Sequence, residues 1–89
     1  MTSYTLGMDD PECCVRHEYK GLVIEIELYR ERDGGFHAMP YVVKSRRSGS
    51  SRRRFVLDVE RFDTKEAALQ AAIVQGQKKI DEGFDPELE

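Results

Sequence analysis

Residues 21–30 alternate apolar and polar side chains, and this pattern constrains the fold more than any other feature of the chain. Leu22, Ile24, Ile26 and Leu28 recur at every second position, and the positions between them are Val23, Glu25, Glu27 and Tyr29. A strand with one aliphatic face and one mostly charged face is typical of an antiparallel sheet that is covered on one side only. The pattern therefore predicts such a sheet, whose cover must come from elsewhere in the chain.

Turn signals divide the next part of the chain into two further predicted strands. Asp33-Gly34-Gly35 supplies the positive φ angles of a tight hairpin, and residues 36–45 alternate again as a second strand. Pro40 has no N–H to donate, so it marks an edge position or a bulge. Residues 46–53 then predict a flexible loop that makes a second hairpin connection, and residues 54–61 predict the third strand, with Phe55, Leu57 and Val59 on its apolar face.

A helix is predicted from residue 64 to residue 82. Asp63 can cap its first turn with Glu66 three residues later, and Gly83 is a natural stop. The spacing of three and four residues places one apolar stripe on the helix, made of Leu69, Ala72, Ile73, Gly76 and Ile80. This stripe is the predicted cover for the aliphatic face of the sheet.

The predicted fold class is α+β, a three-stranded antiparallel sheet in β-β-β-α order packed on one face by a single C-terminal helix. At 89 residues the chain has room for one domain, which we expect to span residues 19–83. Residues 1–18 are expected to form an irregular or mobile arm, with a short strand or turn near residues 15–19 as the alternative. Residues 84–89 are expected to be a mobile acidic tail.

Basic residues are concentrated in one short stretch. Between residues 44 and 54 there are six and no acidic residue: Lys44, Arg46, Arg47, Arg52, Arg53 and Arg54. Removing these six from the 14 lysines and arginines leaves eight against 17 acidic residues, so the rest of the chain carries about −9. The five arginines are candidate phosphate contacts for RNA or DNA, whereas the alternative is a solvated loop whose charge aids solubility.

The outward sheet face is the candidate surface for a protein partner. Tyr29, Met39, Tyr41 and Val43 lie on predicted outward positions and form an apolar patch if they cluster. Strand edges offer a second route, by addition of a partner strand or by pairing in a homodimer. We therefore expect a non-enzymatic binding or accessory domain with an unknown protein partner, as a monomer or weak homodimer, with nucleic-acid binding as the alternative.

The sequence favours no enzyme, cofactor or membrane association. Cys13, Cys14 and His17 could in principle bind zinc, but structural zinc sites need four ligands and adjacent cysteines are awkward ones. Paired carboxylates such as Glu25 and Glu27 are expected to make cross-strand ion pairs. No apolar run approaches the ~20 residues of a membrane helix. The lack of an export signal and the free thiols predict a cytoplasmic protein.

The chain also resembles known families through a series of mostly structural motifs. These are Tyr19-Lys20-Gly21, Asp33-Gly34-Gly35, Phe62-Asp63-Thr64-Lys65-Glu66-Ala67-Ala68 and Ile80-Asp81. Over residues 17–83 it resembles an uncharacterised family of small bacterial β-β-β-α proteins. It is less similar to HicB-type antitoxins, which block a toxin, and to double-stranded-RNA-binding domains. The helix of the latter opens with a lysine-rich motif, where this chain offers only Lys65 beside Glu66.

Overall fold

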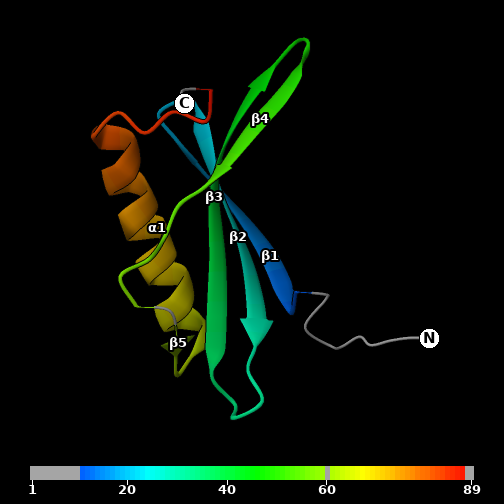
Figure 1. The fold of residues 1–89 in the computed structure, drawn as a ribbon, viewed down its shortest axis with the longest axis vertical. Helices are drawn as coiled ribbons and strands as arrows, with labels where there is room; N and C mark the ends of the chain where they lie inside the picture. Colours follow the sequence, from blue (N-terminus) through cyan, green and yellow to red (C-terminus); the bar gives the residue numbers. More distant parts are fainter. Residues whose placement is uncertain (1–10, 60, 88–89) are drawn as a thin grey trace, which may run out of the picture.

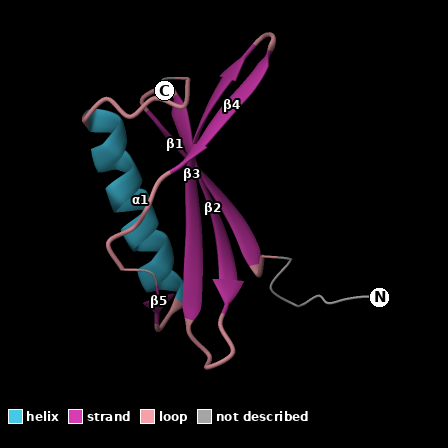
Figure 2. Cartoon of the chain, in the orientation of Figure 1, coloured by secondary structure: helices cyan, strands magenta, loops and turns pink. Residues whose placement is uncertain are grey.

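One helix lies across one face of an antiparallel sheet (Figure 1). The computed structural model describes residues 11–59 and 61–87. The elements, coloured by type in Figure 2, are β1 (Cys13–Tyr19), β2 (Leu22–Arg30), β3 (Phe36–Arg46), β4 (Gly49–Arg54), β5 (Arg61–Phe62) and α1 (Lys65–Asp81). The predicted α+β class with a single helix after the strands is confirmed for these residues. No helix in these two ranges has both the length and the apolar character needed to cross a membrane.

Among the described residues the sheet has five strands, so the prediction of three is wrong. Its order is β1-β2-β3-β4, and the two-residue strand β5 pairs with the other end of β3. The third strand, predicted over 54–61, lies instead at residues 49–54, where it pairs with β3 in a hairpin that turns at residues 47–48. Phe55 and Leu57 are buried after the chain has left the sheet, whereas Val59 is 51% exposed. Phe55 and Leu57 alternate in burial although they pair with no strand, and this alternation led to the wrong bounds for the third strand.

Strand β1 occupies much of the predicted irregular arm. Its seven residues all pair with β2, from Cys13 opposite Leu28 to Tyr19 opposite Leu22. The two-residue turn between them has positive φ at both Lys20 (51°) and Gly21 (82°), which is the conformation that matches the twist of a tight hairpin. The alternative of a short strand near residues 15–19 was the better reading. Residues 1–10 lie outside the described residues.

Small residues on α1 let the helix approach the sheet closely. Ala68, Ala72 and Gly76 are buried on its sheet side, and a Cβ added at Gly76 would lie 2.9 Å from Cδ1 of Ile24. The aliphatic face of β2 is fully buried beneath it at Ile24, Ile26 and Leu28, as the alternation predicts. Three other residues of the predicted stripe flank this contact and are partly buried: Leu69, Ile73 and Ile80.

The helix begins at Lys65, one residue later than predicted, and its cap is also one residue later. The Thr64 hydroxyl oxygen, not the Asp63 carboxylate, accepts a hydrogen bond from the backbone N–H of Ala67, at 3.1 Å. Asp63 instead pairs with Arg61. Gly83 follows the helix with φ of +97°, a conformation that favours glycine, and it turns the chain back toward the sheet.

On the side of β3 away from β2, the paired strand changes from β4 to β5, and Pro40 lies between the two pairings. The backbone N–H of Phe55 donates to the Pro40 carbonyl oxygen at 3.2 Å, on the side away from β2. The N and C=O of one strand residue point to the same side of the strand, so the missing N–H of Pro40 removes no bond to β2. Pro40 is therefore not on an edge strand: β3 lies between β2 and the strands β4 and β5, and Pro40 occupies the gap between the pairings with β4 and β5.

Residues 84–87, predicted to be part of a mobile tail, pack against the sheet. The rings of Phe84 and Phe55 lie 6.0 Å apart, edge to face. Asp85 and Glu87 pair with Lys44, which projects from β3. The packed region therefore extends from β1 to residue 87, beyond both limits of the predicted 19–83 domain.

Candidate functional site

The sheet face turned away from α1, called the outer face below, carries the predicted partner residues. The register places Glu25 opposite Tyr41, Glu27 opposite Met39 and Tyr29 opposite His37. Side chains directly opposite each other on antiparallel strands project from the same face. The described helix, α1, lies on the opposite face of the sheet (Figure 1).

Arg52 of β4 connects the charged centre of the outer face. Its guanidinium binds Glu25 at 3.0 Å and Glu27 at 2.9 Å, and its Cζ lies 3.6 Å from the centre of the Tyr41 ring. Glu25 also pairs with Arg16 of β1. The centre of this face is therefore an ion-pair network in which both carboxylates already have cationic partners, as the prediction of cross-strand pairs requires.

A hollow of about 250 Å³ lies beside this network, where β2 and β3 approach their connecting turn. It is lined by Tyr29, Arg30, Glu31, His37 and Met39. His37 Nε2 lies 3.4 Å from the Met39 sulfur, and the Tyr29 and His37 rings are 6.5 Å apart. Burial and the hydrogen bond to Glu27 both raise the pKa of Tyr29. A hollow of this size suits one large side chain better than a drug-sized ligand.

The four predicted partner residues divide between different roles. Tyr29 and Met39 line the hollow, whereas the ring of Tyr41 is covered by Arg52. Val43 is only 6% exposed because it lies between Val23 and Arg52 on the same face, so it offers no surface to a partner. His37 also lines the hollow but was not among the predicted partner residues. Its alternation with Met39 and Tyr41 along the same predicted strand could have identified it.

The five predicted arginines do not form one patch. Strand alternation directs Arg52 and Arg54 to the outer face, while Arg46 and Arg53 contact residues 84–87 on the helix side. Arg47 lies in the turn of the hairpin. Within residues 11–59 and 61–87, the side chains of Arg47 and Arg54 make no ion pair or hydrogen bond.

The cysteines and His17 do not converge on one point. Cys13 packs against the core on the helix side, and Cys14 is exposed on the other side of the same strand. His17 instead contacts Gln77 of α1, 3.4 Å away. Burial, followed by the charges of Glu25 and Glu27, raises the pKa of the Cys14 thiol, which disfavours the reactive thiolate.

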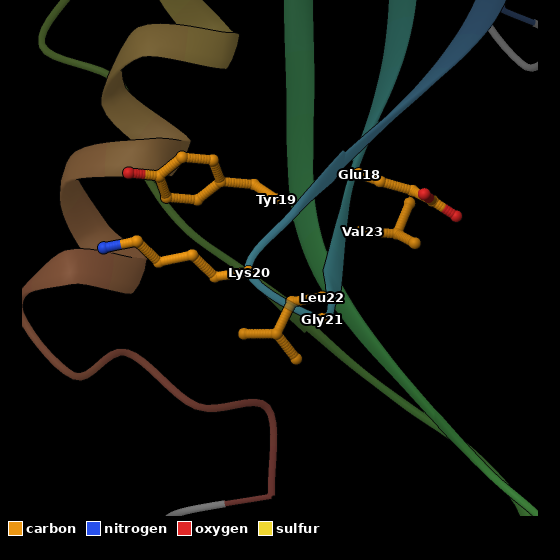
Figure 3. Close-up of a pocket in the computed structure, with 6 residues that line it drawn as sticks. All are labelled: Glu18, Tyr19, Lys20, Gly21, Leu22 and Val23. Carbon is orange, nitrogen blue, oxygen red and sulfur yellow. The ribbon is translucent and has the colours of Figure 1, made fainter.

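A second hollow, of about 380 Å³, surrounds the turn between β1 and β2. Figure 3 shows Tyr19 and Lys20 extending toward α1 while Glu18 and Val23 point away from it. Tyr19 and Lys20 both bind the Asp81 carboxylate, at 3.0 Å and 2.6 Å, and the Lys20 bond is the main cause of the lowered pKa of Asp81. Because its side chains diverge, this hollow brings no chemical groups together, and its contacts hold the hairpin to the helix end.

No protein-family model matches the chain, and neither a curated protein nor a solved structure matches it. The resemblance to small bacterial β-β-β-α proteins stays a prediction, and the candidate site depends on its own geometry.

Replacing Arg52 by alanine is expected to lower the free energy of unfolding by about 1 kcal/mol, because Glu25 and Glu27 lose a shared cation and Tyr41 loses its cover. Arg54→Ala is the matched control, since Arg54 is on the same strand and face, and should change stability by less than about 0.5 kcal/mol. Urea titrations of both variants measure the difference. Equal losses would contradict the network.

Proposed function

We propose that this protein is a non-enzymatic binding module that engages a protein partner through its outer sheet face. The observation that carries the proposal is the Tyr29-His37-Met39 hollow, which lies on the sheet face opposite α1. Tyrosine and methionine are enriched at protein interfaces because they contribute large contact areas. An apolar side chain of the partner would enter the hollow as an anchor.

The charges around the hollow support a role in orienting a partner. Glu31 lines one side of it, and the Arg52 network borders it through Glu27. The Arg30 guanidinium lies instead over the Phe36 ring and binds Glu12. Polar and charged residues at the rim of an interface contribute specificity and association rate more than affinity. We expect the partner to present one apolar anchor within a ring of polar groups.

The free edge of β1 is a second route to the same kind of function. Among the described strands, β1 pairs only with β2, so its other edge can accept an added strand. Arg16 and Glu18 on this strand are charged side chains of the kind that limit uncontrolled edge pairing. Strand addition by a partner or by a second copy would leave the outer face accessible.

A photo-reactive amino acid placed at residue 39 tests the outer-face proposal. The probe at Met39 is expected to give a discrete cross-linked protein in living cells, identified by mass spectrometry. The control probe replaces Val74, which is 53% exposed on α1. The Met39 adduct should be lost when His37→Asp is added, because a carboxylate in the hollow opposes entry of an apolar anchor.

Absence of an adduct at residue 39, or the same adducts at residues 39 and 74, would contradict the proposal. An adduct that survives His37→Asp would place the partner on this face but outside the hollow.

Nucleic-acid binding through the basic hairpin, residues 44–54, is the second candidate function. It is favoured by one observation: this hairpin projects beyond the rest of the sheet (Figure 1), although Glu87 binds Arg46 beside its turn. Arg47 at the turn and Arg54 on the outer face are its unpaired cations among the described residues. Both are accessible to a phosphate backbone.

Binding of a fluorescent single-stranded RNA tests this second candidate. Arg47→Glu with Arg54→Glu should weaken binding by about tenfold or more at low salt, with affinity falling steeply as salt rises. Lys78→Glu with Lys79→Glu makes the same change in net charge at the end of α1 and should have little effect. Equal weakening by both pairs, or no binding at low salt, would contradict it.

A further inference from the structure

The helix-side face of the basic hairpin already holds a peptide segment, which belongs to the chain itself. Residues 84–87, Phe-Asp-Pro-Glu, lie across a surface formed by Lys44, Arg46, Arg53 and Phe55, called the segment-binding surface below. This surface is opposite the outer face, so it is separate from the site of the proposed function.

Two carboxylates of the segment match two cations of the surface. Glu87 uses both oxygens to bind Arg46, in the forked geometry that guanidinium and carboxylate groups favour. Lys44 lies between the two carboxylates, 3.3 Å from Asp85 and 3.4 Å from Glu87. The Arg46 bond is the largest cause of the lowered pKa of Glu87. The pKa of Asp85 is lowered first by the hydrogen bond from the Glu87 backbone N–H and then by the Lys44 bond.

The aromatic ring of the segment is held from two sides. Phe84 contacts the edge of Phe55, and the guanidinium of Arg53 lies 4.7 Å from the centre of its ring. Arg53 also approaches the Asp85 carbonyl oxygen at 3.5 Å. The surface therefore binds an aromatic ring, one main-chain oxygen and two carboxylates, which follow one another along the segment.

The residues of the surface are positioned by elements outside the segment that covers it. Lys44 and Arg53 are placed by the pairing of β3 with β4, and Phe55 by its burial in the core. The segment is joined to the helix through Gly83, and its ion pairs are partly exposed. Partly exposed ion pairs are weak, so we expect the segment to leave without unfolding the domain.

We propose that the segment-binding surface is a docking site for an acidic segment of a partner protein, and that residues 84–87 occupy it until such a partner displaces them. The partner segment would carry an aromatic residue followed by two carboxylates with the spacing of Phe84, Asp85 and Glu87. The chain's own segment then acts as a competitor, whose attachment gives it an effective concentration of about 1 mM.

A labelled peptide with the sequence of residues 83–89 tests the proposal as a partner segment supplied in trans. Binding is measured by fluorescence anisotropy to the full chain and to a variant with Asp85→Asn and Glu87→Gln. Neutralising the attached segment should tighten peptide binding about fivefold or more, because the competitor is weakened. Phe84 stays in the protein, so the peptide ring must displace the attached Phe84 ring from Phe55 in order to bind.

Charge reversals on the hairpin locate the bound peptide. Lys44→Glu with Arg46→Glu, added to the neutralised variant, should abolish binding. Arg47→Glu with Arg54→Glu makes the same change in net charge on the same hairpin and should alter the affinity less than about twofold. A peptide with Phe84→Ala should bind about tenfold more weakly, because the ring loses its contacts with Phe55 and Arg53.

Three results would overturn the proposal. The first is equal peptide affinity for the full chain and its neutralised variant, and the second is equal loss from the two charge reversals. The third is equal binding of a scrambled peptide, which would reduce the surface to a general anion site. Tighter binding of single-stranded RNA than of the peptide, lost with Lys44→Glu and Arg46→Glu, would assign the surface to phosphate instead.

Discussion

The close approach of α1 to β2 is the contact on which the rest of the structure depends. Gly76 has no side chain, and Ile24 fills the space that a Cβ would occupy. Together with Ala68 and Ala72, it lets a single helix bury the aliphatic face of the sheet. Because the only helix among the described residues is committed to that face, the outer face is left for ion pairs, aromatic rings and partners.

The pleat of the β3–β4 hairpin then directs the basic residues of the stretch 44–54 to two opposite faces of the sheet. Arg52 projects to the outer face and binds Glu25 and Glu27, whereas Arg53, the next residue, contacts Phe84 on the helix side. A run of arginines that is continuous in sequence is therefore divided in space. One set neutralises the outer face, and the other holds residues 84–87.

The sequence predicted those strands, and the helix, in which apolar residues recur with a clear period. β2, β3 and α1 have clear apolar periodicity, and their cores agree with it at Ile24, Val42 and Ala72. β1 was predicted only in part, as the alternative near residues 15–19, because its inward positions include Cys13 and His17, which are weak apolar signals. β4 was displaced because serine and arginine carry no apolar period, while Phe55 and Leu57 imitate one outside the sheet.

The candidate site could be predicted only in part, because register decides which outward residues are accessible. Tyr29 and Met39 follow from alternation and line the hollow, but the covering of Val43 depends on which residue of β4 lies opposite it. The contacts of residues 84–87 depend on the turn at Gly83 and on the hairpin returning to the helix end. No local pattern encodes that juxtaposition.

The division of the arginines between two faces is the central claim, and nuclear Overhauser contacts in solution test it most directly. The account predicts contacts between the Arg52 side chain and the Tyr41 ring, and separately between the Arg53 side chain and the Phe84 ring. Contacts of Arg53 with Tyr41, or a Phe84 ring without contacts to Phe55 and Arg53, would contradict it.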